Sequence, residues 1–195
     1  MAGLSKDPRV DQSGLVDVLS AHAQPYWLAL GRFIDSFVAV EIGMQELLAI
    51  ESGVSVQTAK ALFQGLQIDR ANDALKKIWA ANQRTPPDFL SRALVQLVLI
   101  NSARNDILHR GARFDGKRWL VKTKNRADMV RVVTADTLES MTQDTLTIGM
   151  AFAAHAMEFG VGRVQEIRSQ FLDRVAEEWK FSPRIEQRAR PDAAP

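Results

Sequence analysis

The stretch that most constrains the fold of this 195-residue chain is an apolar run from Phe89 to His109. Its hydrophobic residues recur on every side of a helix, and they are Leu90, Ala93, Leu94, Val95, Leu97, Val98, Leu99 and Ile100. A helix that is hydrophobic all round belongs inside a protein. We therefore expect this run to form a central, buried helix.

Polar residues continue the leucine face of this helix. At about 100° per residue, one face carries Leu90, Leu94, Leu97, Asn101, Arg104, Asn105 and Leu108. Val98 and His109 lie at the edge of that face. Burying polar groups without partners costs roughly 1–3 kcal/mol each. We therefore expect Asn101, Arg104 and Asn105 to bind one another, a second chain or a ligand in a cleft.

The spacing of Arg104 and His109 raises a geometric problem. The two residues are five apart, so their side chains diverge by about 140° on an ideal helix. Asn105 and His109 are four apart and lie together. Arg104 therefore either reaches round the helix to meet His109 or meets a second copy of the motif.

The segments before this run are predicted to be helices over 15–23, 25–50, 55–63 and 69–82. Pro25 suits the first position of a helix, and Asp69 suits an N-cap. The segment 85–88, Thr-Pro-Pro-Asp, has the form of a capping box before the central helix. Glu41 falls on the apolar stripe of its helix. It is either a tolerated boundary carboxylate or the partner of a buried arginine, for which Arg104 is the candidate.

The hydrophobic period changes after Gly111, which is expected to end the central helix. Asp115-Gly116 is a strong turn signal and predicts a β-hairpin of 112–114 and 117–122. A third short strand is expected at 129–133. A last long helix begins at Thr134 or Asp136, bends at 160–162 and continues over 164–179.

These patterns together predict an all-α fold, a helical bundle with a small β-hairpin insert at about 112–133. We expect a single domain over 13–181, with flexible tails at 1–12 and 182–195. The chain has no cysteine and three histidines without a His-Glu-x-x-His spacing, so we expect no metal site and no cofactor. His22 and His155 are interpreted as structural. No apolar run approaches the roughly 18 residues of a membrane span, and no signal peptide is evident, so the expected location is cytoplasmic.

Positive charge is concentrated beside the end of the central helix. Residues 104–131 hold nine basic and three acidic residues, a net +6, so the rest of the chain nets −4 within the total of +2. Such a cluster suits binding to a phosphate backbone. The candidate RNA-binding residues are Arg110, Arg113, Lys117, Arg118, Lys122 and Lys124. Trp119 and Phe114 either offer stacking faces to bases or pack on the core, which we favour for Trp119.

The motif Arg104-Asn105-x-x-x-His109, followed by Gly111 at the end of an apolar helix, resembles the signature of the HEPN superfamily. The resemblance covers the motif and its helical surroundings, roughly residues 15–180. It implies a HEPN-like helical domain. Many HEPN proteins are metal-independent endoribonucleases that act as homodimers with two motifs facing each other. For a toxin or phage-defence effector of this type, an antitoxin or regulatory protein is a further expected partner.

The resemblance also implies roles for individual residues. Arg104 would bind the scissile phosphate and offset its developing charge. His109 would accept the ribose 2′-OH proton or protonate the leaving 5′-oxygen, and Asn105 would bind the phosphate or orient the imidazole. Glu41 and Asn101 are the expected supporting residues. The alternative is a non-catalytic HEPN module that binds RNA, nucleotides or protein, in which the same three side chains serve the fold.

Overall fold

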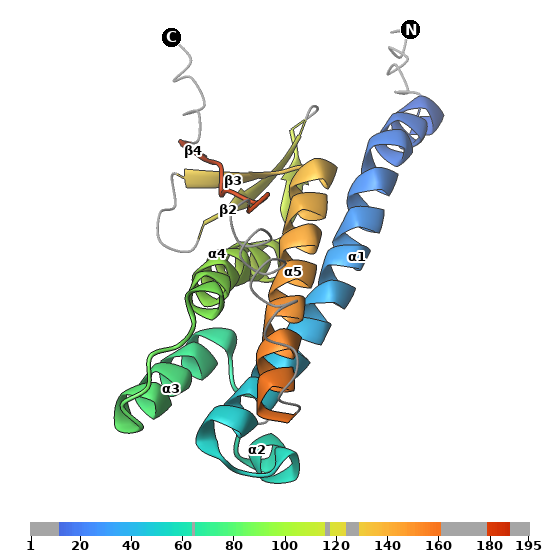
Figure 1. The fold of residues 1–195 in the computed structure, drawn as a ribbon. Coiled ribbons are helices and arrows are strands. Elements are labelled where there is room, and N and C mark those ends of the chain that lie inside the picture. The colour runs from blue at the N-terminus through green and yellow to red at the C-terminus, as the bar shows by residue number, and fades with distance from the viewer. Residues whose placement is uncertain (1–11, 64, 116–117, 124–128, 161–178, 188–195) are drawn as a thin grey trace, which may run out of the picture.

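A computed structural model shows how the helices pack (Figure 1) and describes residues 12–63, 65–115, 118–123, 129–160 and 179–187. The elements are α1 (Gln12–Ser52), α2 (Val56–Phe63), α3 (Ile68–Ala81), α4 (Asp88–Arg110), β1 (Ala112–Phe114), β2 (Trp119–Lys122), β3 (Met129–Val133), α5 (Ala135–Gly160) and β4 (Ile185–Gln187). The described chain is mostly helical, as expected. It carries a four-stranded antiparallel sheet, so the all-α prediction with a single hairpin understated the β-structure.

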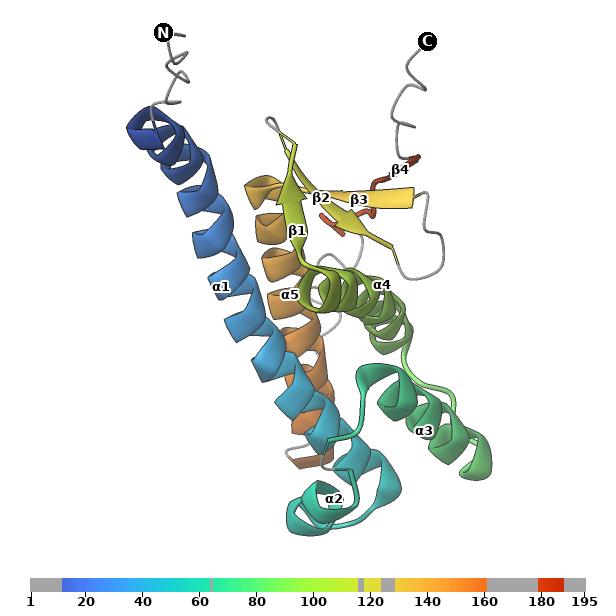
Figure 2. The ribbon, with the colours of Figure 1, turned by 180° about the vertical axis from the view of Figure 1, so that it is seen from behind.

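Helices α1 and α5 run side by side and form the main core (Figures 1 and 2). The buried side chains between them and their neighbours include Phe33, Phe37, Val40, Met44, Leu138, Met141, Ile148 and Phe152. At Gly43, a Cβ atom would lie 3.3 Å from the Phe152 ring. The missing side chain therefore lets the two helices approach closely at this point.

Helix α1 is longer than the sequence indicated, because the two helices predicted over 15–23 and 25–50 are one. Pro25 lies inside this helix and not at its first position. An interior proline removes one backbone hydrogen bond and costs about 3 kcal/mol. The buried residues that follow it, Tyr26, Ala29 and Phe33, supply packing that offsets this cost.

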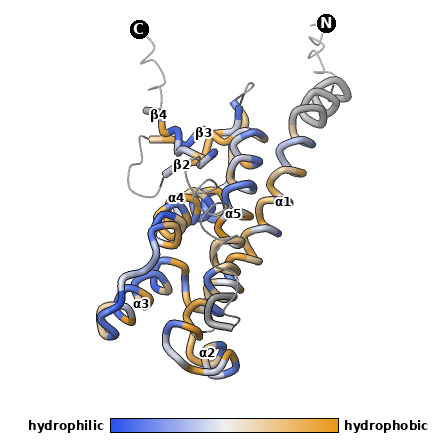
Figure 3. Tube along the Cα trace, viewed as in Figure 1, coloured by the Kyte–Doolittle hydropathy of each residue, from blue (hydrophilic) through white to orange (hydrophobic). Residues whose placement is uncertain are grey.

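The first turns of α3 and α4 differ from the predicted caps. Helix α3 is amphipathic, as the alternating colours in Figure 3 show. Its N-cap residue is Gln67, without a side-chain cap, and Asp69 instead accepts a hydrogen bond from Asn101. Helix α4 begins after Pro87, also without a side-chain cap. The predicted capping box at 85–88 does not form, because the N-cap position falls on Pro87, which has no side-chain acceptor, and not on Thr85.

Helix α4 is buried on one side and not all round. Leu90, Leu97 and Ile100 are fully buried, whereas Val95 is 65% exposed and Leu108 is 44% exposed. Val95 lines a largely apolar cavity of about 600 Å³ between α3 and α4. The expectation that α4 is buried on every side is therefore wrong.

The sheet has the strand order β1-β2-β3-β4, with every neighbouring pair antiparallel. The predicted hairpin and third strand are confirmed, and Gly111, with φ +66°, ends α4 and leads directly into β1. Strand β4 was not expected, because residues 185–187 fall within the predicted C-terminal tail. It pairs with β3 and covers an edge that would otherwise be open. The predicted bend at 160–162 and helix at 164–179 lie almost wholly outside the described residues.

A buried hydrogen-bond cluster holds the segment that leads into β4. Asp144 accepts hydrogen bonds from the backbone N–H groups of Lys180 and Phe181, each at 2.8 Å. The Gln96 amide donates both to Asp144 and to the Phe181 carbonyl, also at 2.8 Å. Helices α4 and α5 therefore both fix the start of the C-terminal segment.

Trp119 joins the sheet to α1. Its ring stacks on Tyr26 with a centroid distance of 4.5 Å, and Phe114 lies 5.2 Å from it. Of the two alternatives for Trp119, packing on the helical core is the one that forms. The Tyr26 hydroxyl is buried without a hydrogen-bond partner among the described residues.

Tyr26 provides a test of this packing, because it is the only tyrosine of the chain. Burial raises the pKa of Tyr26 from 10.0 to about 12. Tyr26 therefore ionises at a lower pH in the unfolded chain than in the folded protein. The stability that the protonated phenol contributes is present below pH 10 and is lost as the pH rises to about 12. Absorbance titration should show tyrosinate forming near pH 12 in the folded protein. A folded-state midpoint near 10 would contradict the burial, and Tyr26→Phe should remove this part of the alkaline loss of stability.

Candidate functional site

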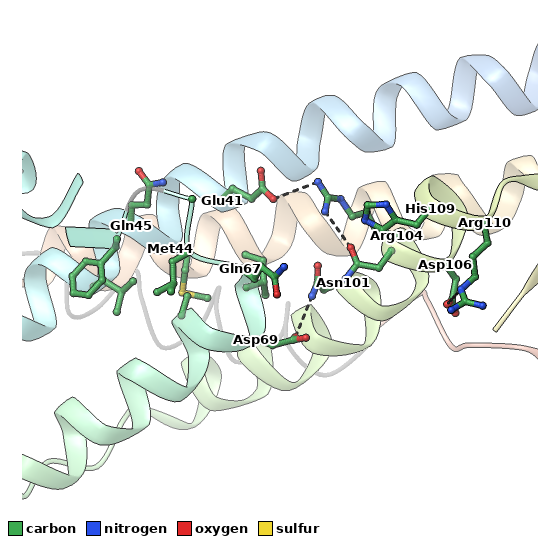
Figure 4. Close-up of a pocket in the computed structure, with 17 residues that line it drawn as sticks. Glu41, Met44, Gln45, Gln67, Asp69, Asn101, Arg104, Asp106, His109 and Arg110 are labelled. Carbon is green, nitrogen blue, oxygen red and sulfur yellow. Dashed lines mark hydrogen bonds and ion pairs between the residues drawn. The ribbon is translucent and has the colours of Figure 1, made fainter. Parts of the chain in front are cut away.

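The end of α4 opens into a cavity of about 550 Å³ that is bounded by α1, by the connection from α2 to α3, and by α4 (Figure 4). The cavity brings together all five residues that the sequence placed in the candidate site or its support. They are Glu41, Asn101, Arg104, Asn105 and His109. Residues from two helices that are distant in the sequence therefore share one concave surface.

Arg104 is held at this cavity by three groups. One terminal nitrogen lies 3.5 Å from the Glu41 carboxylate, and the other donates to the Asn105 carbonyl oxygen at 3.2 Å. Its guanidinium carbon lies 5.0 Å from the centre of the Phe37 ring. Glu41 is thus the partner of Arg104 and not merely a tolerated carboxylate at the boundary of the apolar stripe. Each terminal nitrogen still has an N–H group for an anion in the cavity.

His109 lies in the last turn of α4 with an exposed side chain, at the same end of the cavity as Arg104 (Figure 4). No hydrogen bond joins the two side chains in the part of the chain that the structure describes. Arg104 extends toward α1, where it contacts Glu41. The imidazole is accessible from the cavity and from solvent.

Asn101 forms part of the cavity wall. It is buried, and its amide donates to the Asp69 carboxylate of α3 at 3.1 Å. This bond ties α4 to α3 beside the motif. Asn101 thus meets the expectation of a satisfied polar residue, but its partner lies on another helix and not within the motif.

Asp106 is a site residue that the sequence reasoning missed. It is buried, and its carboxylate lies 3.2 Å from Arg131 of β3 and 3.6 Å from Arg110. Arg110 also donates to the Thr123 carbonyl at 3.2 Å. An arginine among the hydrophobic residues of β3 was the available signal, since an arginine that is buried there needs an anionic partner.

The predicted RNA-binding residues have unequal surroundings. Arg118 pairs with Glu186 of β4 at 2.8 Å, and Arg110 pairs with Asp106. Arg113 and Lys122 are exposed and have no ion pair within the described ranges. The register places these two on one face of the sheet, opposite the buried Val121. Lys117 and Lys124 lie outside the described residues.

A second buried ionic group lies away from this cavity. Glu51, near the end of α1, contacts His155 of α5 and lies 3.2 Å from Arg84. None of these residues lines the cavity beside the motif. The group links the ends of two packed helices, which agrees with the structural interpretation of His155.

Among the described residues, no three histidine, aspartate or glutamate side chains gather in a way that could hold a metal ion. No helix within those residues has the length and apolar character needed to cross a membrane. Neither the models of protein families, nor the curated proteins, nor the solved structures give a match to this chain.

The contact between Asp106 and Arg131 can be tested by protein stability. Asp106→Ala should lower the free energy of unfolding by about 3–5 kcal/mol, because it leaves Arg131 buried without its counter-charge. The control Asp69→Ala, which removes a single hydrogen bond from Asn101, should cost about 1 kcal/mol. Denaturant unfolding measures both values.

A double variant separates the lost counter-charge from a general loss of packing. Replacing both partners, as Asp106→Leu with Arg131→Met, should recover most of the lost stability, because an apolar pair of similar size leaves no uncompensated buried charge. Arg110, the other partner of Asp106, is exposed. Equal losses of unfolding free energy for Asp106→Ala and Asp69→Ala would contradict the assignment of Asp106 as the counter-charge of the buried Arg131.

Proposed function

We propose that this protein is a metal-independent endoribonuclease of HEPN type, with Arg104, Asn105 and His109 as its catalytic residues. The observation that carries the proposal is that a fixed arginine and an accessible histidine line one end of the same cavity. These are the two kinds of group that RNA cleavage requires when no metal takes part.

RNA supplies its own nucleophile, the ribose 2′-OH. In the proposed reaction the 2′-oxygen forms a bond to phosphorus, and the bond from phosphorus to the 5′-oxygen breaks. His109 accepts the 2′-OH proton while water protonates the leaving 5′-oxygen, or water accepts the first proton while His109 supplies the second. Arg104 binds the non-bridging oxygens, with Asn105 beside it. The products are a 2′,3′-cyclic phosphate and a free 5′-OH.

Glu41 acts in this proposal as a positioning residue. Its contact with Arg104 holds the guanidinium toward α1 and keeps one N–H group of each terminal nitrogen available. Asn101 and Asp69 support the wall on which the motif lies. The exposed Arg113 and Lys122 on the sheet would add attraction for the RNA backbone.

The proposed active form is a homodimer, in which Arg104 of one chain serves the site of His109 from the other. What supports this is that no hydrogen bond joins Arg104 and His109 within the described residues, although both line one cavity. A two-fold axis would pair the motifs reciprocally. A cytoplasmic toxin or defence effector with an antitoxin or regulatory partner is the setting that we propose for such an enzyme.

The chemistry is tested by cleavage of end-labelled RNA in EDTA. The wild-type protein should produce cyclic phosphate ends without metal. Arg104→Ala and His109→Ala should each lower the rate by about 100-fold or more, since each removes a group that acts in the transition state. Arg92→Ala, which changes an exposed arginine on the same helix, is the matched control and should cleave normally. Circular dichroism and light scattering confirm the fold and the oligomeric state of each variant.

The dimer is tested by mixing the two inactive variants. A mixed dimer of Arg104→Ala and His109→Ala chains holds one composite site with both groups intact, so cleavage should partly return after the chains exchange. Failure to recover any activity, although the mixed dimer forms, would contradict a shared site.

The second candidate is a non-catalytic module that binds RNA, nucleotides or protein. The observation in its favour is that Glu41, Asn105 and Phe37 together hold Arg104, as they would hold a purely structural arginine. Folded wild-type protein that cleaves none of a varied set of RNAs would favour this function. Loss of the dimer in the Arg104 and His109 variants would make the motif structural.

A further inference from the structure

The cavity extends well beyond the catalytic motif. From Glu41 it continues along α1 to Gln45 and Met44, and Gln67 lies between these residues and the motif (Figure 4). Phe63, at the end of α2, also lines this part of the cavity, which we call the far end. The charged lining residues are Glu41, Asp69 and those on α4, whereas the far end is lined by apolar side chains and amides.

The floor of the far end is apolar and well buried. Met44 is 2% exposed and Leu48 is 1% exposed, and both belong to the core of α1. Phe63 and Leu66 are half-buried at its side. Phe63 and Leu66 therefore supply the accessible apolar surface at this end, in front of the core, and such a surface accepts the flat, uncharged face of an aromatic ring system.

Two glutamine side chains line this end of the cavity. The side chains of Gln45, on α1, and Gln67, before α3, make no hydrogen bond within the described residues, although Gln45 is half-buried. An amide both donates and accepts hydrogen bonds. It therefore matches the donor and acceptor pairs on the edge of a nucleobase.

The far end lies within reach of a nucleoside whose phosphate is bound at Arg104. Gln45 follows Glu41 by four residues, which is about 6 Å along a helix, and Glu41 is the residue that contacts Arg104. One face of α1 therefore carries both Glu41, which contacts Arg104, and, one turn further on, the side-chain amide of Gln45. A phosphate and its attached base would be bound side by side.

We infer that this end of the cavity is a nucleobase subsite, which binds one unpaired base next to the scissile phosphate of single-stranded RNA. The inference rests on the proposed ribonuclease function and adds its substrate specificity. Phe63 and Leu66 contact the face of the base, and Gln45 and Gln67 bind its edge. Unpaired RNA bases are recognised in this way, by stacking together with hydrogen bonds to an exposed edge.

The test is to map cleavage sites on an RNA pool in which all four bases occur equally at every position. Wild-type protein should prefer particular bases at one position beside the cleaved bond. Gln45→Leu with Gln67→Leu should reduce that preference by about tenfold, because a leucine has similar size but cannot read the base edge. Gln143→Leu, which changes an exposed glutamine on α5, is the matched control and should keep the wild-type preference. Neither glutamine side chain makes a hydrogen bond within the described residues, so the double variant should stay folded by circular dichroism.

A binding experiment distinguishes failure of the subsite from failure of the proposed reaction. Calorimetry measures the binding of each of the four ribonucleoside monophosphates to wild type and to the double variant. Base-selective binding that the double variant loses supports the subsite, even where no RNA is cleaved and the ribonuclease proposal fails. Cleavage with an unchanged base preference in the double variant, or equal binding of all four nucleotides, overturns the subsite and leaves the ribonuclease proposal standing. Absence of both cleavage and nucleotide binding overturns both.

Discussion

The buried ion pair between Asp106 and Arg131 is the contact on which the arrangement of the site depends. It joins the last turns of α4 to the inner strand β3, and both side chains are buried. Successive residues of a helix project about 100° apart, so fixing Asp106 toward the sheet also fixes the directions of its neighbours. Arg104 then faces α1, and His109 is left open to the cavity.

Much of the fold could be predicted from local patterns, because these act over a few residues. The helical period located α2 to α5, and the Asp115-Gly116 pair located the hairpin. The site followed from two anomalies, polar residues on the leucine face of α4 and Glu41 on the apolar face of α1. A polar group buried without a partner lowers the stability of the fold. The ion pair of Glu41 with Arg104 offsets part of that loss.

The features that could not be predicted arise from contacts between distant parts of the chain. Asp106 and Arg131 are separated by the hairpin, and only the strand register brings them together. The continuation of α1 through Pro25 depends on packing against α5 and the sheet, which overrides a strong local signal. Strand β4 is polar and short, and its place depends on a contact with Asp144 that its own residues do not reveal.

The position of β4 has a consequence for how this protein behaves when its C-terminal segment is cut. Removing the residues from 179 onward would expose the N–H and C=O groups along one side of β3. It would also leave Asp144 buried without the backbone donors that it binds. Open edges of this kind invite pairing with the same edge of another molecule. Proteolysis near the end of the chain would thus promote self-association through the sheet.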